Sequence, residues 1–167
     1  MTKQKDTSKK KASPSKDWLI ASNKKAYHEY TVLETYQTGI VLTGSEIKSI
    51  REGKVSLKQS YARLENGEIF LFGAHIAPYE KAAHYNHDPE RPRKLLLTKA
   101  EIRKLVGKMK TSGLTLIPLK MYFKRCWVKI DLGVCKGKKL HDKRDSISER
   151  DSKRDIARAL KTSARSS

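Results

Sequence analysis

Cysteine is scarce in this 167-residue chain, which contains only two. Two cysteines cannot build the disulfide framework of a small secreted domain, so we expect a reducing compartment, the cytoplasm. Long apolar runs are absent too: none approaches the roughly 20 residues that span a bilayer. No apolar segment follows the basic N-terminal stretch. We therefore expect neither an integral membrane protein nor a secretory signal.

Acidic residues are few relative to basic ones. Asp and Glu total 18 against 37 Lys and Arg, so the formal net charge is +19 and the isoelectric point is near 10.0. An excess of this size attracts polyanions over long range. It makes nucleic acid the leading class of partner and an acidic membrane surface the second.

Signatures of catalysis are missing as well. The sequence has no Gly-rich phosphate loop, no nucleophile elbow and no H-E-x-x-H motif. His84 and His87 have a spacing that suits a metal, but a solvated polar loop is the better interpretation. Cys126 and Cys135 lie an odd number of positions apart in one alternating strand, so they point to opposite faces and cannot share a metal or a bridge. We expect Cys126 in the core, Cys135 as a plain thiol, and no catalytic site, metal or cofactor.

Apolar and charged residues divide the chain into three parts. Residues 1–17 are Lys, Ser and Thr with almost nothing apolar, so they cannot offset the entropy cost of ordering and should be disordered. Residues 18–135 hold nearly every aromatic and β-branched residue, enough for one small domain. Residues 136–167 are basic with few large apolar side chains, which predicts a tail that is disordered or helix-prone.

Strand signals dominate the middle part. Composition and rough alternation predict strands over residues 28–36, 39–42, 60–65, 68–72, 114–123 and 126–135. Asn66-Gly67 lies between two of these runs and favours a type I′ hairpin, because both residues tolerate a positive φ angle. Pro118 lies within another run and indicates an edge strand or a bulge, since proline cannot donate to a sheet.

Two helices are expected between the strands. Thr43 with Glu46, and Thr98 with Glu101, form T-x-x-E capping patterns ahead of apolar helical faces, and a glycine follows each as a stop. Glu46 is therefore interpreted as a capping acid. Short antiparallel strands with inserted helices favour a mainly β fold, an OB-fold-like antiparallel barrel, because closing the sheet removes its exposed edges.

Basic side chains recur at two places in this domain. Three follow one face of the first helix and its exit: Lys48, Arg51 and Lys54. A solvated charged face explains that trio about equally well. Arg91, Arg93 and Lys94 precede a short apolar strand, and three exposed side chains of this kind would contact phosphates rather than read bases. One or two of the tyrosines could stack on unpaired bases.

The most distinctive segment follows the last strand. It is a basic run interrupted by a histidine: Lys136-Gly137-Lys138-Lys139-Leu140-His141-Asp142-Lys143-Arg144. Residues 145–162 then mix acids and bases with no Pro or Gly. Such a stretch is too weakly apolar to form a stable helix alone, but segments of this kind fold when they meet an RNA surface.

Five segments of the chain, taken together, resemble those of one known family. They are Asn23-Lys24-Lys25-Ala26 with His28-Glu29-Tyr30, Gly44 to Lys54, Phe70 to Ala74 with Ile76-Ala77-Pro78, Asp88 to Leu97, and Gly137 to Arg144. In this order they resemble the SmpB family of SsrA-binding proteins, partners of transfer-messenger RNA (tmRNA) in bacterial ribosome rescue, and the resemblance covers residues 22–162. No single segment is specific, but five in the right order with family-like spacing are very specific.

The resemblance implies an OB-fold barrel without catalytic activity that binds the tRNA-like domain of tmRNA. Such a protein delivers tmRNA to stalled ribosomes for trans-translation and stands in for the missing anticodon arm. No membrane partner and a monomeric state are expected. The RNA-facing candidates are Asn23, Lys24, Gln37, Lys48, Leu96 and Lys129, and the basic clusters add Arg51, Lys54, Arg93 and Lys94. Gln37 stands where many members of the family have Glu.

The same resemblance implies that the tail contacts the ribosome. Residues expected at the decoding centre are Lys136, Lys138, Lys139, His141, Asp142, Lys143 and Arg144. Residues expected in a helix within the empty mRNA channel are Asp155, Arg158, Leu160 and Lys161.

Two other classes remain open on the sequence alone. A structural ribosomal protein or translation factor with an OB domain would have equally basic tails, but not the ordered set of motifs. A nuclease would need clustered carboxylates or a metal site, and the sequence predicts neither.

Overall fold

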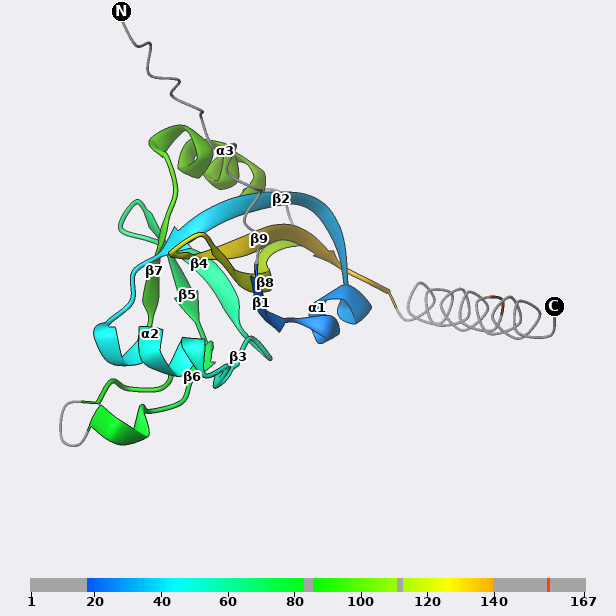
Figure 1. Ribbon diagram of the computed structural model, residues 1–167. Coiled ribbons are helices and arrows are strands. Elements are labelled where there is room, and N and C mark those ends of the chain that lie inside the picture. The colour runs from blue at the N-terminus through cyan, green and yellow to red at the C-terminus, as the bar shows by residue number, and fades with distance from the viewer. Residues whose placement is uncertain (1–17, 83–85, 111–112, 140–155, 157–167) are drawn as a thin grey trace, which may run out of the picture.

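The computed structural model describes residues 18–82, 86–110, 113–139 and 156 (Figure 1). In chain order the elements are β1 (Trp18–Ser22), α1 (Lys24–Glu29), β2 (Tyr30–Ile40), α2 (Gly44–Arg51), β3 (Val55–Ser56), β4 (Tyr61–Glu65), β5 (Glu68–Phe72), β6 (His75–Ile76), the 3-10 helix η1 (Glu80–Ala82), β7 (Arg93–Leu96), α3 (Lys99–Met109), β8 (Leu114–Lys124) and β9 (Trp127–Gly137). The described residues are thus mainly strand, as the sequence predicts.

The antiparallel sheet closes into a ring. Its strands follow the order β1-β8-β4-β5-β7-β2-β9, and β8 also pairs with β9 along nearly its whole length. The 11-residue strand β8 therefore has β1, β4 and β9 as neighbours and joins the two sides of the sheet. This closure confirms the predicted OB-like barrel, with β3 and β6 pairing beside it.

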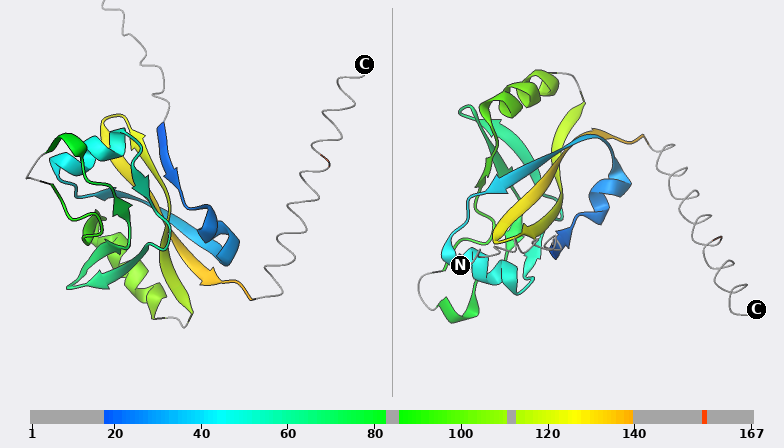
Figure 2. Two further views of the ribbon diagram at one scale, coloured as in Figure 1. Left: turned by 90° about the horizontal axis from the view of Figure 1, so that it is seen from below. Right: turned by 45° about the horizontal axis from the view of Figure 1, so that its top comes forward.

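Both predicted helices begin at the predicted capping boxes. Thr43 with Glu46 and Thr98 with Glu101 make reciprocal bonds between side chain and backbone at the starts of α2 and α3. After α2, Gly53 has a φ angle of +72°, which favours glycine. The two helices lie at opposite ends of the barrel (Figures 1 and 2). From there Ile50 and Leu105 reach the core.

Two local strand predictions are confirmed and one is wrong. Asn66 and Gly67 have φ angles of +50° and +78° in the β4–β5 hairpin. The β8–β9 register shifts just after Pro118, so the bulge is present. Residues 28–36 and 39–42 do not form two strands, because α1 occupies residues 24–29 and β2 runs unbroken from Tyr30 to Ile40.

The core consists of inward-facing side chains of alternating strand residues. On β9 these include Ile130, Leu132 and Val134, and Met121 faces them from β8. A second, smaller cluster lies on the outer side of β8 and β9, where α1 covers them. It contains Ala26, Ile117, Leu119 and Cys135. The helix α1 therefore shields one end of the outer face of these strands.

The cysteine prediction is wrong in its assignment of core and surface. Cys126 is exposed because it lies in the β8–β9 turn, before β9 begins at Trp127. Cys135 is buried beneath α1, and this burial raises the pKa of its thiol to about 11. Both are free thiols.

Candidate RNA interface

Three strands bring two of the RNA-facing candidates together on the outside of the barrel. Gly39 of β2 pairs with Leu96 of β7 on one side and with Lys129 of β9 on the other. Residues opposite each other in antiparallel strands point to the same face, so Leu96 and Lys129 flank Gly39. A Cβ on Gly39 would lie 3.2 Å from that of Leu96, so glycine lets Leu96 lie close to β2. Leu96 is 51% exposed, unusual for leucine on a strand.

Gln37 lies on the same face, two residues before Gly39. Its Nε2 donates to the Tyr122 hydroxyl, which in turn donates to Asp131 Oδ1 at 2.9 Å. Lys124 Nζ donates to Gln37 Oε1 at 3.0 Å. The amide of Gln37 is therefore held between a cation and a tyrosine–carboxylate pair. Beside this network lies a hollow of about 360 Å³ lined by Leu19, Gln37, Lys120, Tyr122 and Asp131.

The helix α1 adjoins this face at its other end. Ser22 at the end of β1 pairs with Lys120, which lines the hollow beside Gln37, and α1 begins two residues later at Lys24. Lys24 is exposed on the same helix. We call the surface formed by Lys24, Gln37, Leu96, Lys124 and Lys129 the β2–β9 face. Three cations on it can neutralise phosphates, and Leu96 adds an exposed aliphatic side chain at its β7 edge.

The three bases around α2 do not act as one cationic face. Lys54 pairs with Glu80 at 2.6 Å and with Glu52 at 3.1 Å, and the bond to Glu80 raises the pKa of Lys54. Lys48 Nζ lies 5.3 Å from the centre of the Tyr79 ring. Arg51 is exposed. Two cations thus remain available at this end of the barrel, and the third is neutralised locally.

The prediction that Arg93 is an exposed phosphate contact is wrong. Along β7, Arg93 and Leu95 point inward while the alternate residues point outward, and Arg93 is 0% exposed. Its Nε donates to Glu46 Oε1 at 2.8 Å, and its two other nitrogens donate to backbone carbonyls of Ala74 and Pro89. This guanidinium joins α2, the β5–β6 connection and the segment before β7. Lys94 does point outward and pairs with Glu68.

Glu46 is a capping acid, as predicted, but it also has a second role that the sequence did not indicate. One oxygen accepts the Thr43 N–H at 2.6 Å, and the carboxylate also binds Arg91 and Arg93. Burial opposes ionisation of Glu46, but the bonds from Arg91, from the Thr43 N–H and from Arg93 prevail and lower its pKa to about 2. The buried carboxylate is therefore ionised at neutral pH.

Asn23 does not face outward either. Its Nδ2 donates to the carbonyls of Leu57 at 2.9 Å and Pro118 at 3.2 Å, and its Oδ1 accepts the Ala26 N–H at 3.1 Å. The side chain is buried and its polar atoms are bonded within the protein, so the expected RNA contact through this amide is wrong. Asn23 instead caps α1 and ties it to the barrel.

Only the start of the predicted ribosome-facing segment lies among the described residues. β9 continues to Gly137, with Lys136 opposite Thr31, and the Lys138 N–H donates to the Glu29 carbonyl. Lys136 and Lys139 are exposed. The remaining predicted tail contacts lie outside the described residues: His141, Asp142, Lys143, Arg144, Asp155, Arg158, Leu160 and Lys161.

Comparison with known proteins identifies the family. The sequence model of the SmpB protein family matches residues 20–162. The chain belongs to the SmpB family. It is 60% identical over 140 residues to the SsrA-binding protein of Desulfitobacterium hafniense (strain DSM 10664 / DCB-2), covering 84% of this chain and 90% of that protein.

Two further SmpB-family comparisons agree. The chain is 54% identical over 143 residues to the SsrA-binding protein of Carboxydothermus hydrogenoformans, covering 86% and 96% of the two chains. A solved structure described as "tmRNA-SmpB: a journey to the center of the bacterial ribosome" is 49% identical, with a TM-score of 0.62. The match covers 76% of this chain and 93% of that one. The resemblance drawn from the motifs is therefore confirmed.

In this SmpB-family chain, the sequence reasoning missed Lys124 of the β2–β9 face and two residues beside that face, Trp127 and Asp131. Lys124 and Asp131 bond within the Gln37 network, and Trp127, which is 73% exposed, follows on the outer side of β9. Trp127, Lys129 and Asp131 occupy alternate positions. The period of two already predicted for this strand could have identified them as one outward set.

Other site classes gain no support from the described residues. They contain no group of three or more His, Cys, Asp or Glu that could hold a metal. His87 is not simply solvated, since its ring nitrogens lie 2.9 Å from Ser45 Oγ and 3.1 Å from the Ile76 carbonyl. His84 lies outside the described residues. No described helix is long and apolar enough to span a membrane.

Proposed function

We propose that the chain binds tmRNA, the SsrA RNA, through its tRNA-like domain and delivers it to stalled ribosomes for trans-translation. Membership of the SmpB family carries the proposal, because its relatives are SsrA-binding proteins and one has been solved with tmRNA in the context of the ribosome. The chemistry of the β2–β9 face supports it. Cations there can bind phosphates, while exposed Leu96 can pack against a sugar or an unstacked base.

The proposed role is binding without catalysis, exerted in the cytoplasm by a monomer. A-form major grooves are too narrow for side chains to read, so specificity must come from RNA shape and from splayed bases. A barrel with fixed strands supplies a rigid platform for such recognition. In this role the protein takes the place of the anticodon arm that tmRNA lacks.

The tail is proposed to engage the ribosome rather than tmRNA. Lys136, Lys138 and Lys139 leave the barrel at the end of β9, and the basic run continues through His141 to Arg144. We propose that this run contacts the decoding centre and that the segment including Asp155 to Lys161 becomes helical in the empty mRNA channel. A tail that becomes ordered only on a matching surface would bind the ribosome firmly only when the mRNA channel is empty.

Neutralising the β2–β9 face should weaken tmRNA binding. For Lys24→Ala with Lys129→Ala we expect about tenfold lower affinity for tmRNA. The slope of the logarithm of affinity against the logarithm of salt concentration should also be smaller, by the equivalent of about two phosphate contacts. Filter binding over a range of salt concentrations measures both. Lys99→Ala with Arg103→Ala on α3 removes the same charge from exposed positions elsewhere and serves as the control. Equal losses in the two double variants, or no binding of tmRNA by the parent chain, would contradict the proposal.

Removing the tail should separate the two proposed contacts. A chain ending at Lys139 keeps all of β9 and its bonds to α1. We expect it to fold and to bind tmRNA with affinity within a few-fold of the full chain, yet to fail in tmRNA-dependent tagging on stalled ribosomes. Thermal unfolding, filter binding and a reconstituted tagging assay test this. Normal tagging by the shortened chain would show that residues 140–167 are not needed.

A further inference from the structure

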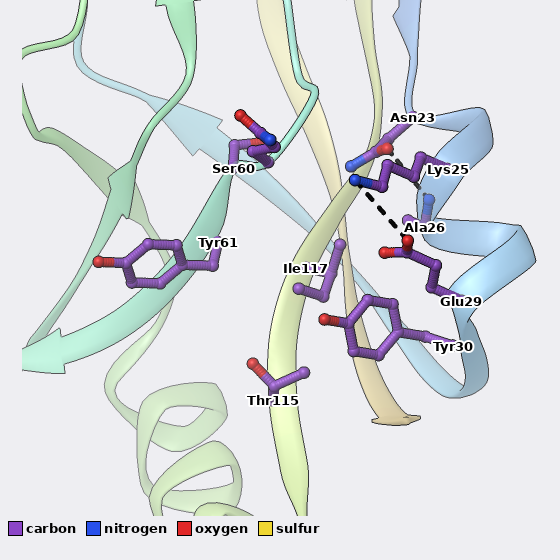
Figure 3. A pocket seen from close by; sticks show the side chains of 10 residues that line it. Asn23, Lys25, Ala26, Glu29, Tyr30, Ser60, Tyr61, Thr115 and Ile117 are labelled. Atoms are coloured by element: carbon purple, nitrogen blue, oxygen red, sulfur yellow. Dashed lines mark hydrogen bonds and ion pairs between the residues drawn. The ribbon is translucent and has the colours of Figure 1, made fainter. Parts of the chain in front are cut away.

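A second concave surface lies outside the β2–β9 face. It is a hollow of about 330 Å³ between α1 and the strands β4 and β8 (Figure 3). Its lining residues are Asn23, Lys25, Ala26, Glu29, Tyr30, Gln59, Ser60, Tyr61, Thr115 and Ile117. Tyr61 and Tyr30 lie on opposite sides of it, with Ile117 between them (Figure 3). The volume is at the lower end of the range for sites that bind small ligands.

One wall of the hollow continues into an exposed aromatic stack. The rings of Tyr61 and Phe72, opposite each other on β4 and β5, lie 5.7 Å apart and 19° from parallel. The guanidinium of Arg63 lies over the other ring of this pair, 4.4 Å from the centre of Phe72. Tyr61 is 41% exposed. Aromatic and arginine planes exposed on an antiparallel sheet are the platform on which many proteins stack unpaired bases.

Polar groups around the hollow can read the edge of a base. The side chains of Tyr30, Gln59 and Thr115 have no hydrogen-bond partner among the residues that the structure describes. The turn that carries Gln59 is fixed. Ser60 Oγ donates to the Leu57 carbonyl at 2.6 Å, and Gln59 itself has a φ angle of +60°, in the left-handed region that costs energy for a residue with a Cβ.

Charge at this surface is balanced locally. Lys25 pairs with Glu29 at 3.7 Å on the rim, and Arg63 donates to Glu65 through its Nε at 2.8 Å. Stacking and hydrogen bonding, rather than net positive charge, must therefore supply most of the binding. This distinguishes the hollow from the β2–β9 face, where Lys24, Lys124 and Lys129 form no ion pair among the described residues and Lys124 contacts a neutral amide.

We propose that this hollow and the adjoining Tyr61–Phe72–Arg63 stack form a second RNA site, which takes one or two unpaired nucleotides. The site does not depend on tmRNA being the ligand of the β2–β9 face. The nucleotides can come from tmRNA or from the ribosome, and the same chemistry recognises both.

Two substitutions at one position test the site in the full chain. Tyr61→Phe keeps the aromatic ring, whereas Tyr61→Leu removes the ring but keeps an apolar side chain. With a labelled hexaadenylate we expect about tenfold weaker binding for Tyr61→Leu and a change within twofold for Tyr61→Phe, measured by fluorescence anisotropy. The difference should persist at raised salt, because it does not depend on net charge. A short RNA duplex should show no difference, and unfolding midpoints should match.

Equal hexaadenylate binding by the two variants, or a difference that disappears at raised salt, would overturn the site. The affinities of the variants for whole tmRNA and for ribosomes then identify which RNA supplies the unpaired nucleotides. If Tyr61→Leu binds tmRNA or ribosomes more weakly than the parent chain, the proposal is supported and the RNA is identified. A loss on ribosomes without one on hexaadenylate indicates a protein contact and overturns it. If the parent chain did not bind tmRNA, the proposed function would be wrong, but the hexaadenylate measurement would still test the second RNA site.

Discussion

Replacing Glu46 with alanine is expected to lower the free energy of unfolding by about 3 to 5 kcal/mol. The substitution leaves the guanidinium of Arg93 buried without its counterion, and removing one partner of a buried pair costs this much. Arg91 loses the same partner but is part-exposed and can turn to water. The N–H of Thr43 at the start of α2 also loses its acceptor. Urea unfolding followed by circular dichroism measures the change.

Controls and pH dependence sharpen this result. Glu52→Ala removes an exposed carboxylate at the end of the same helix and should change stability by less than about 0.5 kcal/mol. In the parent chain the pKa of Glu46 is about 2 when folded against an ordinary 4.5, so its contribution is complete above about pH 5. It is then lost as pH falls toward 2. Between about pH 5 and pH 2 the free energy of unfolding should fall less steeply in Glu46→Gln than in the parent chain. If the two chains lost stability identically over this range, Glu46 would not be the ionised partner of the buried Arg93.

Replacing Asn23 with alanine is expected to lower the free energy of unfolding by about 1 to 3 kcal/mol. The amide is buried, and its removal takes a donor from the carbonyls of Leu57 and Pro118 and an acceptor from the N–H of Ala26. The Leu57 carbonyl keeps its bonds from Ser60, and the Ala26 N–H keeps the backbone carbonyl of residue 23, so the Pro118 carbonyl loses most. Each unsatisfied buried group costs about 1 to 3 kcal/mol, with some relief from water entering the hollow nearby. The loss should also fray α1, which has only six residues and depends on this cap. Thermal and urea unfolding test it.

The neighbouring residues supply matched controls for this substitution. Ser22→Ala changes an exposed side chain and should leave stability unaltered. Lys24→Ala should also leave stability unaltered, while weakening tmRNA binding. At a temperature where Asn23→Ala remains folded, its tmRNA affinity should stay within a few-fold of the parent. If Asn23→Ala were fully stable and yet unable to bind tmRNA, the side chain would be an RNA contact after all.

The sequence predicted those parts of the fold that depend on local rules. Capping boxes at Thr43 and Thr98, the Asn66-Gly67 turn and the bulge at Pro118 each follow from the chemistry of a few adjacent residues. The helix α1 escaped prediction because its stability comes from Asn23, whose amide bonds residues far along the chain. Propensity within a short window cannot register such a tertiary contact.

The candidate site was less predictable for the same reason. Lys24, Leu96 and Lys129 were named from the family resemblance, and the pairing of Gly39 places the last two on either side of β2. Arg93 carries the same charge as Lys94, and it is buried because it points inward in the alternation of β7, where it meets Glu46. The stack of Tyr61, Arg63 and Phe72 spans the hairpin that was predicted at Asn66-Gly67, yet its outward orientation depends on which face the core occupies.

The pairing of β8 and β9 has a consequence for how the protein is made. These strands are the last of the barrel to be synthesised, and β2 finds its long partner only when β9 appears some hundred positions later. The nascent chain must therefore hold β2 with an open edge through most of translation, the condition in which strands aggregate. Such distant contacts give a high contact order, so refolding in milliseconds to seconds, rather than microseconds, is to be expected.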